Sequence, residues 1–217
     1  MPICSGSSRP CEASRWADVL AKRVLDLLLS GLGLLMLAPL LIAIALWIKR
    51  DSPGPVLFRQ ERVGRGGRVF LIHKFRTMAS DAPARGPQIT VGADPRITRA
   101  GRWLRASKLD ELPQLWDVLR GAMSLVGPRP EVPRYVAQYP DDLRAIVLSV
   151  RPGITDTASL EYRDEARLLA EAADPEHCYV EVVLPAKLAL SARYVQTRSF
   201  GGDIVLVLLT LRALIHR

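Results

Sequence analysis

The sequence predicts an α-rich α+β protein: a re-entrant membrane segment (a helix, a break and a second helix) followed by a cytosolic domain with a few short strands and interfacial amphipathic helices. The membrane segment is predicted from the run Leu27–Ile48, twenty-two residues without a charge. As a helix rising about 1.5 Å per residue, this run just matches a bilayer core of about 30 Å. Helix-type apolar spacing dominates the rest of the 217-residue chain, with only short strand-like stretches.

Charge is concentrated directly after the apolar run. The chain has 30 Lys+Arg and 22 Asp+Glu, a formal charge of +8. Lys49–Lys108 contains fourteen basic and four acidic residues, so this block carries +10 and the remainder −2. Such a block predicts an anionic partner: nucleic acid, anionic lipid or a phosphorylated substrate. A hydrophobic content of 49% excludes a disordered polyelectrolyte, and the three cysteines have no metal-site spacing.

The N-terminal part is divided into two regions. Residues 1–15 are predicted to be a disordered tail, and residues 16–50 a re-entrant membrane helix broken at Pro39. Both flanks of the apolar run are basic, with Lys22 and Arg23 before it and Lys49 and Arg50 after it. Because cytoplasmic flanks carry the positive charge, we prefer a segment that returns to the same face over a kinked bitopic span. A signal peptide is excluded by the late start and the length.

Residues 51–217 are predicted to form the cytosolic, membrane-associated domain. Asp51–Pro55 is a turn, and apolar stretches on either side of Gly64–Gly67 predict a hairpin. That glycine cluster matches no phosphate-binding fingerprint. A loop is expected over 79–95. The C-terminal helix is too short to span and belongs in the core or on the membrane surface. Helices are predicted at Arg99–Ser107, Asp110–Leu119, Asp141–Val150, Glu161–Ala173, Leu184–Val195 and Gly202–His216.

Two adjacent carboxylates, Asp110 and Glu111, are the strongest candidates for chemistry. Pro113 is tolerated only in a first helical turn, so the helix is expected to begin near Asp110, where free backbone N–H groups favour negative charge. Adjacent residues point about 100° apart on a helix, which gives the two carboxylates different roles: one a nucleophile, the other a base or metal partner. The alternative, that Asp110 only caps the helix, is favoured by the local sequence alone.

Several cations are candidates for binding phosphate. Prolines on both sides of Arg129 hold it in a stiff loop, Gly127–Pro130, and Lys74–Arg76 offers a second clamp at a strand end. Arg105 belongs to a row of basic residues in which only neighbours such as Arg102 and Arg105 can share one target. No histidine is in a catalytic context, and nucleic-acid-binding motifs are missing from the sequence.

Taken together, these motifs resemble the small monotopic phosphoglycosyl transferases, the bacterial sugar transferases that load a polyprenyl phosphate with a sugar phosphate. The similarity covers nearly the whole chain from about Ala21. It is carried by ordered motifs: Lys22-Arg23-x-x-Asp26, Pro39, Asp51–Val56, Arg59-Gln-x-Arg62-x-Gly64, Lys74–Met78, Lys108–Leu115, Met123–Pro130 and Arg151–Thr155.

The resemblance implies a monotopic protein on the cytosolic face of the bacterial inner membrane and a two-step reaction. The Asp110 carboxylate attacks the β-phosphorus of a UDP-sugar, expels UMP and forms a phosphosugar-enzyme intermediate, which polyprenyl phosphate then attacks. Glu111 assists, Mg²⁺ is bound by Asp110 and Glu111, Lys74, Arg105 and Arg129 bind phosphate, and Arg163 contacts the nucleotide. UDP-sugar, polyprenyl phosphate, membrane lipids and downstream glycosyltransferases are the implied partners, nucleic acid is not, and for Asp110 catalysis then outweighs capping.

The chain departs from the family pattern in two places. Ala38-Pro39 stands at the membrane break where the family commonly has Ser-Pro, and Asp156–Arg163 replaces a usual Gly-Trp continuation. The second departure affects sugar and nucleotide contacts. Two alternatives are kept beside the transferase: a catalytically silent membrane-bound module that binds anionic lipid, and a membrane-tethered nucleic-acid binder.

Overall fold

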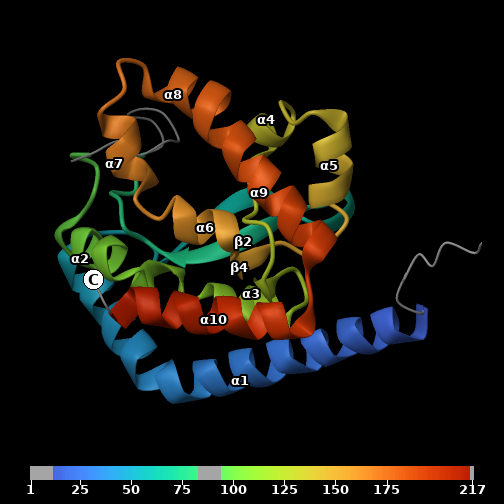
Figure 1. Ribbon diagram of the computed structural model, residues 1–217. Coiled ribbons are helices and arrows are strands. Elements are labelled where there is room, and N and C mark those ends of the chain that lie inside the picture. Colours follow the sequence, from blue (N-terminus) through green and yellow to red (C-terminus); the bar gives the residue numbers. More distant parts are fainter. Residues whose placement is uncertain (1–11, 83–93, 216–217) are drawn as a thin grey trace, which may run out of the picture.

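The computed structural model describes residues 12–82 and 94–215. It begins with α1 (Glu12–Asp51), a helix of 40 residues that contains Pro39. Figure 1 shows that this helix is bent along its length. Proline inside a helix is a common cause of such a bend. The predicted break is therefore a bend within one continuous helix. Residues 12–15 of the predicted tail already belong to α1, and residues 1–11 lie outside the described part.

α1 is long and apolar enough to cross a membrane, and only 11% of its most apolar window is buried. Such exposure is not expected of a core helix in water. Its last turns behave differently, because Ile44 and Ile48 are buried against Phe75 and Leu104 of the domain. One end of the helix is thus part of the domain core while its middle is left without protein cover.

The other end of α1 is fastened to the domain by polar side chains. Lys22 Nζ donates to the carbonyl oxygen of Val126 at 2.9 Å, and Arg23 Nη1 donates to that of Val118 at 2.9 Å. Asp26 accepts from the backbone N–H of Leu125 at 3.0 Å. These three residues form the Lys-Arg-x-x-Asp motif, which therefore anchors the membrane helix to the domain.

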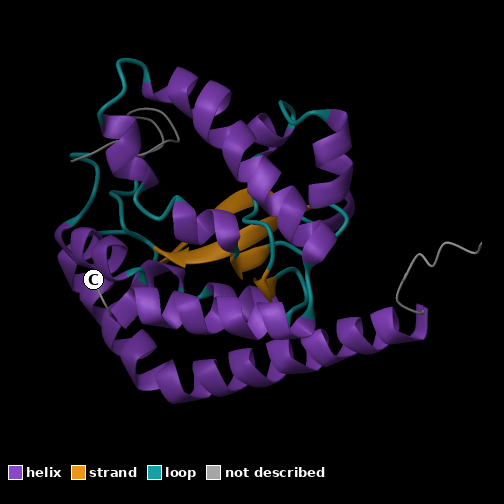
Figure 2. Ribbon diagram, in the orientation of Figure 1, coloured by secondary structure: helices purple, strands orange, loops and turns teal. Residues whose placement is uncertain are grey.

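In the described part of the chain, four strands form two small sheets between the helices (Figure 2). β1 (Leu57–Val63) and β2 (Val69–Phe75) make the predicted antiparallel hairpin around the short 3-10 turn η1 (Arg65–Gly67). β3 (Ser124–Val126) and β4 (Gly153–Thr155) pair in parallel and were not predicted, because three residues carry no periodicity. A Cβ on Gly153 would lie 2.1 Å from the Gly127 nitrogen, so this crossing requires glycine.

Most predicted helices are present, with shifted ends. Two predictions are corrected: the helix over Asp110–Leu119 is a 3-10 turn followed by a short α-helix, and the helix over Glu161–Ala173 is divided. The bounds are α2 (Arg99–Ser107), η3 (Leu109–Glu111), α3 (Gln114–Leu119), α4 (Pro133–Val136), α5 (Asp141–Val147), α6 (Thr157–Glu161), α7 (Glu165–Ala170), α8 (Pro175–Cys178), the π-helix η4 (Tyr179–Val183), α9 (Leu184–Thr197) and α10 (Phe200–Ile215).

The main core lies between α9, α5 and α4, where Val136, Val147 and Leu188 are among the buried side chains. α10 returns beside α1, with which it is in contact (Figure 1). Its outer side remains apolar and uncovered, with Leu208 59% and Leu211 51% exposed. Of the two expectations for this helix, the exposure supports a surface position and not a core one.

Candidate active site

The site is built where α2 ends. Lys108 caps α2 in the left-handed conformation, with φ at 57°, and the chain then enters η3, which contains both Asp110 and Glu111. A left-handed lysine costs on the order of 1 kcal/mol, so the surrounding packing imposes this turn. The carboxylates therefore precede the first residue of α3, Asp110 by four positions and Glu111 by three, instead of opening the helix.

Asp110 is buried, with 8% of its surface exposed. Its Oδ1 atom is enclosed and has no hydrogen-bond partner among the described residues. The capping interpretation is therefore wrong, because α3 has Pro113 at its cap position and no side-chain cap. Burial and the neighbouring Glu111 raise the pKa of Asp110, while Lys74 and Arg105 act in the opposite direction. A buried carboxylate oxygen without a hydrogen-bond donor is available to attack or to bind a ligand of the site.

Glu111 is held in the opposite state. Its Oε1 accepts from Lys74 Nζ at 2.8 Å, and Arg129 donates through both terminal nitrogens, Nη1 reaching Oε2 at 3.1 Å. Burial raises the pKa of Glu111, but Arg129 and Lys74 outweigh burial and hold the pKa well below its usual range. The structure thus brings together two of the predicted phosphate-binding cations, Lys74 from β2 and Arg129 from the loop after β3, on one ionised carboxylate.

Arg105 approaches from α2. Its Nε donates to Thr77 Oγ1 at 3.1 Å, just beyond the end of β2. Helix α2 can lie this close because it has glycine at position 101: a Cβ there would be 2.0 Å from the Thr77 carbonyl oxygen. Arg105 also lowers the pKa of Asp110, because its positive charge favours the ionised carboxylate.

Two predicted contributors lie elsewhere. Arg163 is half-exposed and pairs with Asp164 at 3.5 Å; only its carbonyl oxygen, which accepts from Lys108 Nζ at 3.5 Å, connects it with the turn before Asp110. The prediction that Lys74–Arg76 forms a second phosphate clamp is wrong for Arg76. Arg76 is 4% exposed and donates to the carbonyl oxygens of Ser52 and Pro53 at 2.7 and 2.6 Å. Arg76 closes the turn after α1, and its guanidinium is occupied by hydrogen bonds to that turn.

That turn also explains why position 54 is a glycine. Gly54 has φ at +121°, and a Cβ there would lie 2.1 Å from Arg76 Nη1. The segment Asp51–Pro55 leads from the membrane helix into β1, and Arg76 ties it to the end of β2, the strand that bears Lys74. Asp51 adds a second connection, because its Oδ2 accepts from the backbone N–H of Ala100 near the start of α2.

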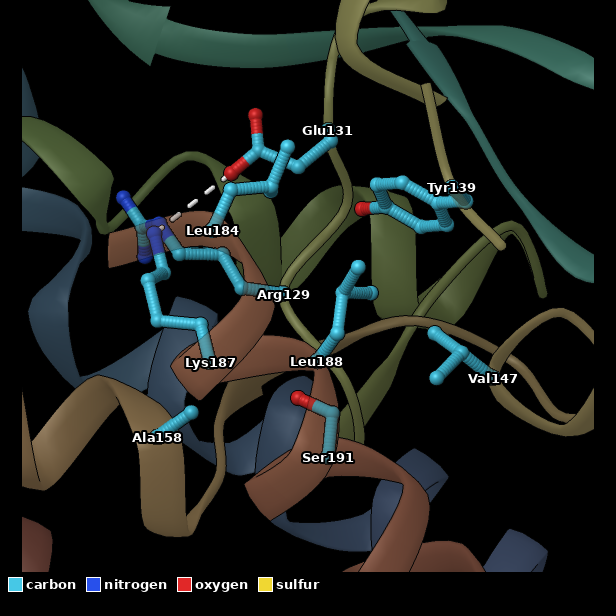
Figure 3. Close-up of a pocket in the computed structure, with 9 residues that line it drawn as sticks. All are labelled: Arg129, Glu131, Tyr139, Val147, Ala158, Leu184, Lys187, Leu188 and Ser191. Atoms are coloured by element: carbon cyan, nitrogen blue, oxygen red, sulfur yellow. Dashed lines mark ion pairs between the residues drawn. The ribbon is translucent and has the colours of Figure 1, made fainter. Parts of the chain in front are cut away.

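A buried polar network behind Arg129 was not predicted. Glu131 accepts from the Tyr179 hydroxyl at 2.7 Å and pairs with Arg62 at 3.4 Å and with Lys187 at 3.5 Å. Figure 3 shows Arg129, Glu131 and Lys187 facing one small pocket of about 20 Å³, a volume that fits a water molecule. Arg62 lies in one of the quoted motifs and Glu131 directly follows another, but Lys187 is isolated in an ordinary helical stretch and gave no signal.

His73 and Asp117 form a further unpredicted pair. Asp117 accepts from the His73 backbone N–H at 2.9 Å and meets its Nδ1 at 2.7 Å. Both side chains are nearly enclosed. The pair joins β2, which precedes the carboxylates in the chain, to α3, which follows them. His73 is also the chain neighbour of Lys74. The pair therefore positions the site without contacting Asp110 or Glu111.

The donor set for a divalent cation is small. No group of three or more His, Cys, Asp or Glu side chains could hold a metal within residues 12–82 and 94–215. Asp110 has an unfilled oxygen, whereas both oxygens of Glu111 are taken by cations. This arrangement fits Mg²⁺, which is commonly bound through one or two carboxylates together with substrate phosphates and water.

Sequence comparison identifies the family to which this geometry belongs. The profile of the bacterial sugar transferase family matches residues 17–217. The chain belongs to the bacterial sugar transferase family. The apolar N-terminal helix agrees with membrane association of this transferase family.

Characterised relatives agree with this assignment. UDP-glucose:undecaprenyl-phosphate glucose-1-phosphate transferase of Caulobacter vibrioides is 41% identical over 93% of this chain and 72% of the relative. Undecaprenyl-phosphate glucose phosphotransferase of Komagataeibacter xylinus is 41% identical over 92% of the chain, and UDP-N-acetylgalactosamine-undecaprenyl-phosphate N-acetylgalactosaminephosphotransferase of Aeromonas hydrophila is 36% identical over 89%. This sugar transferase spans only 36% and 43% of the length of those two relatives.

Proposed function

We propose that this protein transfers a sugar-1-phosphate from a UDP-sugar to undecaprenyl phosphate and releases UMP. The observation that carries the proposal is the buried Asp110 with an unfilled carboxylate oxygen, next to Glu111 held by Lys74 and Arg129. The names of the relatives support the substrate classes, since they include undecaprenyl phosphate as acceptor and UDP-sugars as donors. Those names differ in the sugar, so the sugar is left open.

In the first step, an Asp110 oxygen attacks the β-phosphorus of the UDP-sugar. The bond from that phosphorus to the bridging oxygen breaks, and UMP leaves with the electron pair. In the second step, an oxygen of undecaprenyl phosphate attacks the phosphosugar phosphorus and the bond to Asp110 breaks, which restores the carboxylate. A buried, poorly solvated carboxylate suits the nucleophile because few hydrogen bonds must be given up before attack.

The cations have separate roles. Lys74 and Arg129 hold Glu111 ionised and present positive charge beside Asp110, which would neutralise negative charge on the diphosphate as UMP leaves. Arg105 would bind phosphate from the α2 side and keep part of Asp110 ionised. Mg²⁺, bound through Asp110 and the substrate diphosphate, would supply charge neutralisation of the leaving phosphate. Arg163, half-exposed on the loop over Lys108, is proposed only as a peripheral nucleotide contact.

The reaction belongs to the first membrane step of glycoconjugate assembly, after which downstream glycosyltransferases would extend the lipid-linked sugar. The membrane side of the proposal rests on α1. Lys22 and Ile48 near its two ends both contact the same domain. A monotopic segment with both ends on the cytosolic side satisfies this, whereas a span would place one end across the bilayer from its contacts.

The test is UMP release by the purified full chain in detergent or vesicles with undecaprenyl phosphate, Mg²⁺ and a panel of UDP-sugars. We expect release with at least one sugar and a loss of at least about 1,000-fold in Asp110→Asn. Asp142→Asn, an exposed aspartate on α5, is the matched control and should leave the rate unchanged. Intact-mass analysis without acceptor should show a phosphosugar adduct on the wild type and none on Asp110→Asn.

The main alternative is a silent module that binds anionic lipid. It would bind anionic vesicles as well as the active protein would, but release no UMP with any donor. An active Asp110→Asn variant would remove the nucleophile assignment while leaving the transferase assignment standing.

A further inference from the structure

A groove of about 260 Å³ lies where α9 ends and α10 begins. Its walls include Leu190, Arg193 and Tyr194 from α9, Arg198 and Ser199 from the connection, and Leu206 from α10. None of these residues contacts Asp110 or Glu111 in any hydrogen bond or ion pair of the described chain. The groove is therefore separate from the carboxylate site and is not used by the proposed reaction.

Two unpaired positive charges line the groove. Arg193 and Arg198 are both exposed, and within residues 12–82 and 94–215 neither guanidinium has a hydrogen bond or an ion pair. The nearby acidic group is already neutralised, because Asp203 accepts from both Lys22 and the Tyr194 hydroxyl. The groove therefore carries a net charge of about +2 with no internal counter-charge, and an anion satisfies it.

The surface next to the groove is apolar. α10 leads away from it with Val205, Leu208 and Leu209 between 44% and 59% exposed. α10 is in contact with α1, which is also largely uncovered (Figure 1). A ligand that fits both parts has an anionic head and a long apolar tail. Basic pockets that open beside membrane-facing helices bind lipid headgroups in this way.

We propose that this groove binds the phosphate headgroup of an anionic diacyl phospholipid, with the acyl chains lying along the exposed side of α10. The bound lipid fixes how α10 and the first part of α1 sit at the membrane surface. The two arginines provide bidentate donors for phosphate, and Leu206 and Leu190 contact the glycerol and first methylene groups. This site goes beyond the proposed transferase reaction, and its absence would leave that reaction unaffected because no groove residue belongs to the carboxylate site.

The experiment measures lipid retention by the full chain in nanodiscs of equal parts phosphatidylglycerol and phosphatidylcholine, followed by native mass spectrometry. We compare Arg193→Ala/Arg198→Ala with Arg144→Ala/Arg167→Ala, which removes the same two charges from exposed positions on α5 and α7. At about 1 kcal/mol per arginine near a membrane surface, the groove variant should bind phosphatidylglycerol roughly 30-fold more weakly. The control variant should retain one bound phosphatidylglycerol like the wild type.

Four results would overturn the proposal. Equal retention of phosphatidylglycerol by the groove variant and the control would show that the arginines hold no lipid. Thermal protection of the wild type by inorganic phosphate alone, lost in the groove variant, would make the site one for free anions. Stoichiometric displacement of the retained lipid by undecaprenyl phosphate would assign the groove to the acceptor substrate. A shift from dimer to monomer in the groove variant would assign it to a second copy of the chain.

Discussion

At the scale of single residues, Asp110 and Glu111 are neighbours held in opposite electrostatic states. Burial and the adjacent charge raise the pKa of Asp110, whereas Arg129 and Lys74 overcome burial and lower that of Glu111. Paired titratable groups whose environments separate their pKa values are typical of acid–base and nucleophilic sites. The separation arises from position: Glu111 faces both cations, and Oδ1 of Asp110 faces no donor.

This difference predicts opposite effects on stability. A carboxyl with a raised pKa stabilises the fold only while protonated and loses that contribution as pH rises through the folded pKa. Asp110→Asn should therefore raise the free energy of unfolding at pH 7. Glu111→Gln leaves Lys74 and Arg129 without their counter-charge and should lower it by roughly 2–4 kcal/mol. Chemical denaturation of both variants in detergent measures the two changes, and shifts of the same sign would contradict the assignment.

The pH dependence of activity follows from the same site. Asp110 must be ionised to attack, so UMP release should rise with pH through the raised pKa of Asp110. Arg105 lowers that pKa, and Arg105→Met should therefore move the acidic limb of the rate profile to higher pH as well as slow the reaction.

Two variants separate this effect from a general loss of α2. Arg105→Lys keeps the charge and should return the acidic limb toward its wild-type position. Arg102→Met alters an exposed arginine on the same helix that bonds the Ile97 carbonyl oxygen, and should leave the limb unmoved. An acidic limb that is the same in Arg105→Met and wild type would exclude Arg105 from the electrostatics of Asp110.

At the scale of elements, the site depends on how closely α2 approaches the end of β2. The absence of a side chain at Gly101 permits the contact with Thr77, and the contact in turn places Arg105 on Thr77 Oγ1. Gly101→Ala puts a methyl group 2.0 Å from the backbone oxygen of Thr77, so the helix must move. Because that oxygen belongs to the backbone, a side-chain rotation cannot relieve the clash.

We therefore expect Gly101→Ala to destabilise the protein by about 1–3 kcal/mol and to reduce UMP release by on the order of 100-fold. Thermal unfolding and the transfer assay measure the two effects. Gly201→Ala is the matched control, because a Cβ at that position meets nothing within 4 Å. Normal activity in Gly101→Ala would mean that the Arg105–Thr77 contact is not required.

At the scale of the whole molecule, the membrane helix α1 is attached to the catalytic domain at both of its ends. The Lys22, Arg23 and Asp26 side chains fasten the first part to the backbone of Val118–Val126, and Ile44 and Ile48 pack into the domain near the last turn. With both ends on one domain and the middle uncovered, the bent helix is suited to entering one leaflet and returning.

Cysteine labelling tests this topology. In a chain with Cys4, Cys11 and Cys178 replaced by serine, single cysteines at Asp18 and Arg59 should both react with an impermeant reagent only from the cytosolic side of membrane vesicles. A cysteine at Arg144 on α5 reports the side on which the domain lies and is the control. Labelling of Asp18→Cys and Arg59→Cys from opposite sides would establish a bitopic span.

Much of the site was predictable because its residues lie in short ordered motifs. Lys74, Asp110, Glu111 and Arg129 were assigned from the sequence, and the structure places Lys74 and Arg129 on Glu111, the chain neighbour of Asp110. The motifs could not distinguish Lys74 from Arg76, which stand two residues apart in one strand-like run. Arg76 lies just beyond the strand, where its guanidinium donates hydrogen bonds to the turn after α1.

The sequence by itself determined the elements whose signal is local: the apolar helix, the glycine-containing hairpin, the limits of α2 and the carboxylate pair. Only the tertiary structure decided the features that depend on distant partners. The three-residue strands β3 and β4, the Lys187 contact with Glu131 and the His73–Asp117 pair join segments far apart in the chain. Periodicity and capping act over a few residues, whereas burial and ion pairing are set by what packs against a side chain, which no local pattern contains.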